Sequence, residues 1–176
     1  MMQHQPYRKD GFTLVELMSA VAILSILAAI SWQAMQAPLQ EQRLRQTAVE
    51  LEDLLNTART TAVKTSETCK ISQQTVSGIA VFTSYDSTLA KNNCATTKAL
   101  YLNPYVTGTS KLAIAGPTPF TFTKYGTLDG ATSLTTILSA PGVTAWQWCV
   151  DVSAPAAIVR VGTRANAAST CNYLRK

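Results

Sequence analysis

Glu16 is the only charged residue in the apolar run from Phe12 to Ile30, which contains 19 residues. At about 1.5 Å per helical residue, this run covers roughly 29 Å, the thickness of the hydrocarbon core of a bilayer. A carboxylate at the middle of a membrane costs about 2.5–3.5 kcal/mol on insertion scales, and less near an interface. The chemistry expected of Glu16 is therefore ion pairing with a cationic group.

Catalysis is not expected of the remaining residues. The only histidine, His4, precedes the apolar run, so a serine or cysteine in the rest of the chain has no histidine to activate it. The sequence contains no glycine-rich phosphate loop and no cluster with metal-ligand spacing. The carboxylates of Glu50, Glu52 and Asp53 are interpreted as a solvated helix face. We expect no enzyme, no cofactor and no metal site.

An apolar stripe with spacings of three and four residues predicts that a helix continues beyond the apolar run. The stripe consists of Leu44, Ala48, Leu51, Leu55, Ala58 and Ala62, and we expect it to pack on the protein's own sheet. The other face is predicted to be exposed and carries Glu41, Arg45, Glu52, Asp53 and Arg59. Pro38 is expected to interrupt the helix, because proline lacks the backbone N–H that a helix needs.

From Cys69 onward, alternation replaces the helical period, and several short runs are predicted to be strands. These are Ile79–Phe82, Phe120–Thr123, the run from Trp146 to Val152, and Ile158–Val161. Turn signals such as Asp129-Gly130 separate the runs and favour an antiparallel sheet or small sandwich. The apolar face shared by Trp146 and Trp148 is interpreted as core, with a binding surface as the alternative.

The segment Gly11-Phe12-Thr13-Leu14-Val15-Glu16, which follows a short basic leader, resembles the class III signal of type IV pilins and type II secretion pseudopilins. The resemblance implies that a prepilin peptidase cuts after Gly11 and methylates the new N-terminal Phe12. It also implies that Glu16 neutralises the free N-terminal amine of a neighbouring subunit in a fibre. A secretory signal peptide cut after Ala37 and a plain membrane anchor are the alternatives.

The same resemblance implies an α+β, pilin-like fold, with a long N-terminal helix packed on an antiparallel sheet or small sandwich. The expected divisions are a leader at residues 1–11, a transmembrane and assembly helix at 12–35, an amphipathic helix at 36–66 and a β-rich periplasmic domain at 67–176. The protein is expected in the inner membrane before it enters a pilus or pseudopilus, with the prepilin peptidase and other pilins as partners.

Four cysteines lie in the predicted periplasmic domain, and none of them forms a C-x-x-C pair. An even number in an exported domain predicts two disulfides, for which three pairings are possible. We favour Cys69–Cys94 and Cys149–Cys171, because each pair joins sequence neighbours. On the chain-entropy model, a disulfide that closes a loop of about 20–30 residues contributes roughly 3 kcal/mol to stability.

Within the pilin-like families, the chain resembles the minor pilin group typified by FimT, FimU and GspH, in the helix from Leu44 to Val63, the TPFTFTKYGTL stretch and the late strand that ends in Gly162. We expect a minor type IV pilin that initiates or caps a fibre. A pseudopilin of a type II secretion system is one alternative.

A second alternative is a DNA-binding minor pilin for natural transformation. In FimT-like pilins, a Gly-Arg-x-Arg element of the C-terminal tail binds DNA, and Gly162 and Arg164 match it in part. The candidate DNA-binding residues are Arg160, Arg164, Arg175 and Lys176. The competing interpretation is a solvated basic tail, since a few phosphate contacts give only weak, salt-sensitive binding.

Overall fold

The computed structural model describes residues 13–76, 79–84, 99–101, 112–140, 146–165 and 170–173. The chain divides into two units, Met1–Pro38 and Leu39–Lys176. One helix, α1 (Leu14–Thr65), contributes to both. Pro38 lies inside this helix, so the predicted interruption is wrong: the helix tolerates the loss of one backbone N–H.

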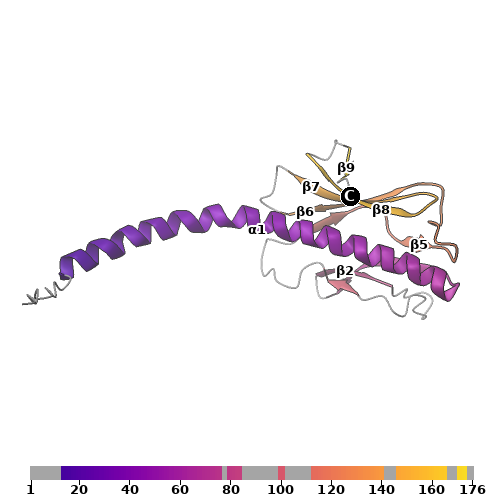
Figure 1. The fold of residues 1–176 in the computed structure, drawn as a ribbon, viewed down its shortest axis with the longest axis horizontal. Helices are drawn as coiled ribbons and strands as arrows, with labels where there is room; N and C mark the ends of the chain where they lie inside the picture. Colours follow the sequence, from indigo (N-terminus) through magenta and orange to yellow (C-terminus); the bar gives the residue numbers. More distant parts are fainter. Residues whose placement is uncertain are drawn as a thin grey trace, which may run out of the picture. The chain divides into compact units, whose positions relative to one another are not determined.

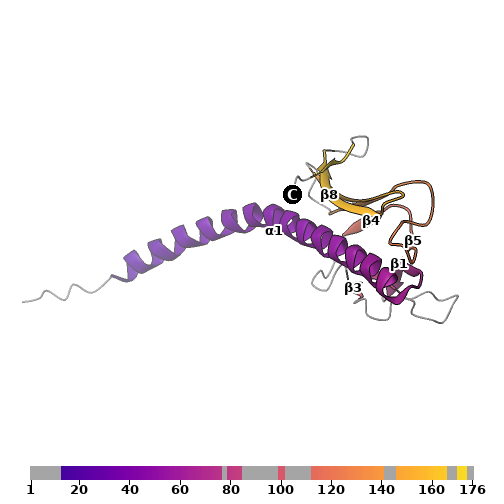
Figure 2. The same cartoon turned by 45° about the vertical axis from the view of Figure 1, so that its right-hand side comes forward.

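The strands of the second unit form two antiparallel sheets. One sheet has the order β3-β2-β1-β5, and the other has the order β4-β6-β7-β8-β9. Figures 1 and 2 show the second half of α1 running alongside the sheets. The strands are β1 (Cys69–Val76), β2 (Ile79–Thr83), β3 (Leu100–Tyr101), β4 (Ala113–Ala115), β5 (Phe120–Phe122), β6 (Leu134–Ser139), β7 (Gln147–Ser153), β8 (Ile158–Arg164) and β9 (Asn172–Tyr173).

The core lies between the second half of α1 and the sheets. All six residues of the predicted stripe, from Leu44 to Ala62, are fully buried, so this prediction is confirmed. They belong to one cluster with residues from both sheets, which include Ile71, Phe82, Phe120, Phe122, Leu138, Val150 and Val152. Trp148 is buried in the same cluster, whereas Trp146, just before β7, is half exposed.

The predicted exposed face of α1 is wrong at Glu52 and only partly right at Arg59. Glu41, Arg45 and Asp53 are exposed, but Glu52 retains only 8% of its exposure and does not belong to a solvated face. Arg59 is half-buried, because its Nε donates a hydrogen bond to the carbonyl of Gly126 at 2.8 Å. The helical period of the sequence does not reveal that the sheets of the second unit, called the head below, also bury helix residues outside the apolar stripe.

Gly126 ends the turn that follows β5 and brings this turn against α1. Its φ of +74° belongs to the left-handed region, and a Cβ at this position would lie 2.9 Å from Cγ2 of Val63. The N–H of Gly126 donates to the carbonyl of Thr123 at 2.9 Å and closes the turn. This glycine therefore supports the contact that Arg59 makes from the helix.

The first unit contains the N-terminal part of α1. The side chains of residues 13–29 are exposed, and the large apolar ones among them are Leu14, Val15, Leu17, Met18, Val21, Ile23, Leu24, Ile26 and Leu27. Within the described part of the chain, no helix meets the length and hydropathy needed to cross a membrane.

Replacement of a large apolar residue of the stripe by alanine should destabilise the head. Leu51 is fully buried, and Leu51→Ala is expected to lower the free energy of unfolding by about 2–5 kcal/mol, since it removes buried methyl groups and leaves a cavity. The matched control is Val49→Ala, two residues away and 49% exposed, which should change stability by no more than about 0.5 kcal/mol. Urea unfolding of the full chain in detergent measures both. Equal losses would contradict the assignment of the core face.

Candidate functional site

The N-terminus of α1 is capped by Thr13. Its Oγ1 accepts a hydrogen bond from the backbone N–H of Glu16 at 3.3 Å, and its carbonyl accepts bonds from the N–H groups of Glu16 and Leu17 at 3.1 and 3.2 Å. Thr13 and Glu16 thus occupy the positions of a capping box, T-x-x-E. The T-x-x-E spacing makes this signature visible in the sequence.

Glu16 lies in the first helical turn, with its side chain exposed. The exposed N–H groups of a helix start carry partial positive charge, which favours a carboxylate there. Glu16 thus has a favourable place in its own helix, and its carboxylate is accessible to a second group. The predicted cleavage residues, Gly11 and Phe12, lie outside the described residues.

A second candidate site, after the helix start at Thr13 and Glu16, lies on the face of the five-stranded sheet that points away from Val150 and Val152. The strand register places Thr135 of β6 opposite Asp151 of β7, and Asp151 opposite Arg160 of β8. Asp151 is only 6% exposed, and its carboxylate accepts hydrogen bonds from Oγ1 of Thr135 and Oγ of Ser153, both at 2.9 Å. A buried carboxylate on the outer face of a sheet needs such donors.

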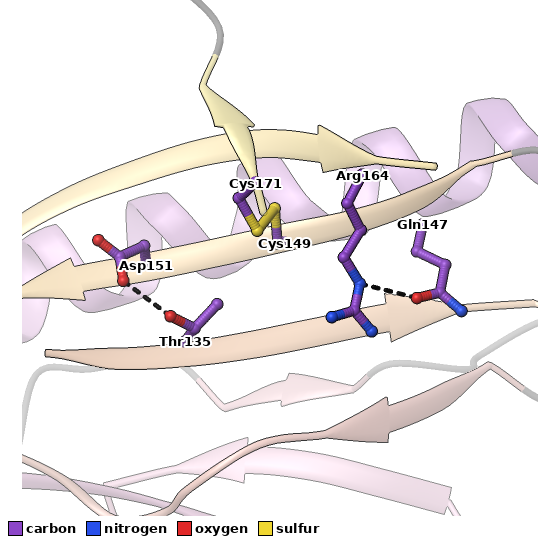
Figure 3. The surroundings of a disulfide bond; sticks show 6 residues. All are labelled: Thr135, Gln147, Cys149, Asp151, Arg164 and Cys171. Atoms are coloured by element: carbon purple, nitrogen blue, oxygen red, sulfur yellow. Dashed lines mark hydrogen bonds between the residues drawn. A yellow bond between two sulfur atoms is a disulfide. The ribbon is translucent and has the colours of Figure 1, made fainter. Parts of the chain in front are cut away.

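The predicted Cys149–Cys171 disulfide is present and joins β7 to the residue before β9 (Figure 3). Cys149 is fully buried, and the two Cα atoms are 6.4 Å apart. Cys69 is also disulfide-bonded. Its predicted partner, Cys94, lies outside the described residues, so the Cys69–Cys94 pairing stays a prediction.

Gly162 allows the C-terminal strand to approach the sheet. A Cβ on Gly162 would lie 2.5 Å from the backbone oxygen of Asn172 and 3.1 Å from Cα of Tyr173. Because Gly162 has no side chain, the backbone of β9 can lie directly against β8. A glycine inside a strand pattern is a sequence signal for such a close approach.

Tyr173 brings an aromatic ring to Asp151 and Arg160. The guanidinium carbon of Arg160 lies 5.7 Å from the centre of the ring, within the range of a cation–π contact. Partial burial, the charge of Asp151 and a hydrogen bond donated to that carboxylate raise the pKa of Tyr173 above its ordinary value of 10.0, while Arg160 opposes the rise. Asp151 therefore anchors three neighbouring hydroxyl groups.

The structure describes two of the four candidate DNA-binding residues, Arg160 and Arg164. Arg160 is exposed on β8, whereas Arg164 is half-buried and its Nε donates a hydrogen bond to Oε1 of Gln147 at 2.8 Å (Figure 3). Arg175 and Lys176 lie outside the described residues. In the described part of the chain, no group of three or more histidine, cysteine or acidic side chains could hold a metal ion.

A long N-terminal helix packed on antiparallel sheets, with a motif for N-terminal processing, defines the pilin-like class. The model of the prokaryotic N-terminal methylation motif matches residues 7–32. The model described as type II transport protein GspH matches residues 47–156, more than half of the chain. The chain therefore belongs to the GspH family of minor pilins and pseudopilins, which are structural subunits rather than enzymes. No curated protein and no solved structure matches it.

The pKa of Tyr173 should respond to the charge of Asp151. A phenol with a raised pKa stabilises the fold fully below pH 10.0, and this contribution is lost as the pH rises through the raised value. Asp151→Asn removes the neighbouring charge and should lower the pKa of Tyr173, whereas Asp129→Asn, at an exposed carboxylate, should leave it unchanged.

The measurement is the phenolate absorbance of each variant, with the titration of its Tyr173→Phe counterpart subtracted to isolate Tyr173. A pKa of Tyr173 that is the same in the Asp151→Asn protein and the parent would show that the carboxylate and the phenol do not interact.

Proposed function

We propose that this protein is a minor type IV pilin that a prepilin peptidase processes and that helps to initiate or cap a pilus. The observation that carries the proposal is the methylation motif at residues 7–32, which includes the start of α1 and its exposed apolar side chains. Exposed leucine, isoleucine and valine side chains over several turns favour burial in a membrane or against other helices.

In the proposed pathway, the peptidase hydrolyses the bond between Gly11 and Phe12, removes the leader at residues 1–11 and methylates the new amine of Phe12. Residues 12–35 hold the protein in the inner membrane before assembly. The amphipathic part of the helix, residues 36–66, and the domain at residues 67–176 lie in the periplasm. The same apolar helix then leaves the lipid and packs among the helices of the fibre.

Glu16 supplies the specific interaction of this assembly. Its carboxylate is exposed in the first turn of α1, four residues after the amine that cleavage would create at Phe12. In a fibre interior, the Phe12 amine of one subunit and Glu16 of its neighbour would neutralise each other. Leaving one of two such buried charges unpaired costs roughly 3–5 kcal/mol.

A pseudopilus of a type II secretion system is the alternative fibre. The description of the matching family model, type II transport protein GspH, is the specific observation in its favour. Both fibres would use the same processing step and the same role of Glu16, so a cellular readout must distinguish them.

Complementation of a deletion strain tests the role of Glu16 and separates the two fibres. Glu16→Gln retains a side chain that suits a capping box but removes the charge. The Phe12 amine would then be buried in the fibre without a partner, which costs several kcal/mol. Incorporation of the Glu16→Gln variant into fibres should therefore fall at least about tenfold. Loss of twitching motility would place the subunit in a pilus, and loss of exoprotein release would place it in a pseudopilus.

The matched control is Glu41→Gln, which removes an exposed carboxylate from the same helix. It should restore function as well as the wild type does. The proposal for Glu16 fails if Glu16→Gln also restores full function, or if both variants are equally defective.

DNA binding stays a second candidate function, and the observation in its favour is the pairing of Arg160 with Tyr173. Arg160 is exposed, and Tyr173, which lies beside it, is 40% exposed. A cation beside an aromatic ring can hold a phosphate while the ring stacks on a base. Arg164 supports the proposal less, because Gln147 already accepts a hydrogen bond from its guanidinium.

If the tail binds DNA, the full chain in detergent should retard a DNA fragment on a gel at low salt, and added salt should weaken the binding. Arg160→Gln should bind DNA more weakly than the wild type at the same salt concentration. The slope of log affinity against log salt should fall by about one, which corresponds to one counterion. Lys124→Gln, at an exposed lysine that also lies beside a tyrosine ring, is the control. No retardation of DNA by the wild type would exclude this candidate.

A further inference from the structure

The C-terminal residues Cys171, Asn172 and Tyr173, called here the β9 cover, include the edge strand β9 and lie against Gly162 of β8 and Cys149 of β7. Cys149 and Gly162 are register partners, so side chains at these two positions point to the same face. The missing Cβ of Gly162 would point into the backbone of Asn172. The β9 cover therefore lies over this face, and the disulfide joins its first residue, Cys171, to β7 (Figure 3).

We propose that the β9 cover is redox-controlled: the Cys149–Cys171 disulfide holds it in place, and reduction of this bond releases it and opens the outer face of the sheet. The released state exposes the Asp151 carboxylate with its hydroxyl partners Thr135 and Ser153, next to Arg160. This inference is independent of the type of fibre that the subunit joins.

The described non-covalent contacts of the β9 cover are its pairing with β8 and the contacts that Tyr173 makes with Asp151 and Arg160. Among the described residues, two register pairs join β9 to β8, Gly162 with Tyr173 and Thr163 with Asn172. Asn172 is exposed and Tyr173 is 40% exposed, so the strand is only partly buried when it docks. Segments with short pairing and little buried apolar area open at low cost. The disulfide is thus the strongest link between the β9 cover and the sheet.

Reduction can start at the accessible sulfur. Cys171 is half-buried, whereas Cys149 is fully buried, so a dithiol reductant would attack Sγ of Cys171 with one thiolate. The S–S bond breaks, and Cys149 leaves as a thiolate that takes up a proton. The second thiol of the reductant then attacks its own sulfur in the mixed disulfide and releases Cys171 as a thiol. Two electrons pass to the protein, and the reductant ends as a disulfide.

The expected effect follows from the 22-residue separation of the two cysteines. Closing a loop of this size changes an opening equilibrium by on the order of a hundredfold on the chain-entropy model. Opening of the β9 cover should therefore become about a hundredfold more frequent once the disulfide is broken. The protection of Cys149 should fall with it, because the cover and the sulfur of Cys171 bury this residue.

Alkylation of the full chain in detergent tests the proposal. After reduction with dithiothreitol, a brief pulse of iodoacetamide is followed by mass spectrometry of the peptides that contain Cys149 and Cys171. We expect both thiols to be alkylated at similar rates. Rapid alkylation of Cys171 while Cys149 stays protected would show that β9 remains docked without the disulfide, and would overturn the proposal.

Hydrogen exchange of Cys171→Ser and its parent, both without reductant, provides the second measurement, since the disulfide at Cys69 then stays closed in both proteins. The amides of Asn172 and Tyr173 should exchange about a hundredfold faster in the variant, while those of Val150 and Val152 in β7 keep their protection. Unchanged exchange in β9 would overturn the proposal. Loss of protection in β7 would also overturn it, because the disulfide would then hold the whole sheet.

Discussion

Burial of one face of α1 is the interaction on which the rest of the head depends. The two sheets have separate strand orders, and their apolar residues join a single core through the stripe from Leu44 to Ala62. Alanine at three of the six stripe positions lets the sheets approach the helix closely. Arg59 and Gly126 add a polar link at the end of the same helix.

The two candidate sites follow from this arrangement in different ways. One face of β7 and β8 packs in the core, so the alternate residues Asp151 and Arg160 lie on the outer face. Tyr173 contacts both of them there. In the first unit, the apolar side chains from Leu14 to Leu27 are exposed, whereas the core cluster of the described residues begins at Leu44. In the proposed function, the head gives the subunit its surface, and the N-terminal helix gives it a place in the fibre.

Much of the fold could be predicted from the sequence, because it depends on local patterns. The helical period located the buried stripe, and alternation located β5, β7 and β8. The burial of Glu52 and the hydrogen bond of Arg164 to Gln147 could not be predicted, because both depend on which segments distant in sequence meet. Gly162 shows the same limit: a glycine in a strand indicates a close approach, but only the register identifies Asn172 as the partner.

We propose that this member of the GspH family works as a processed fibre subunit, with the amine of Phe12 as the partner of Glu16. The most direct test is the N-terminal sequence and mass of the protein isolated from the membrane or fibre fraction of its native host. The account predicts a chain that begins at N-methylated Phe12. A chain that still carries residues 1–11, or one that begins after Ala37, would contradict it.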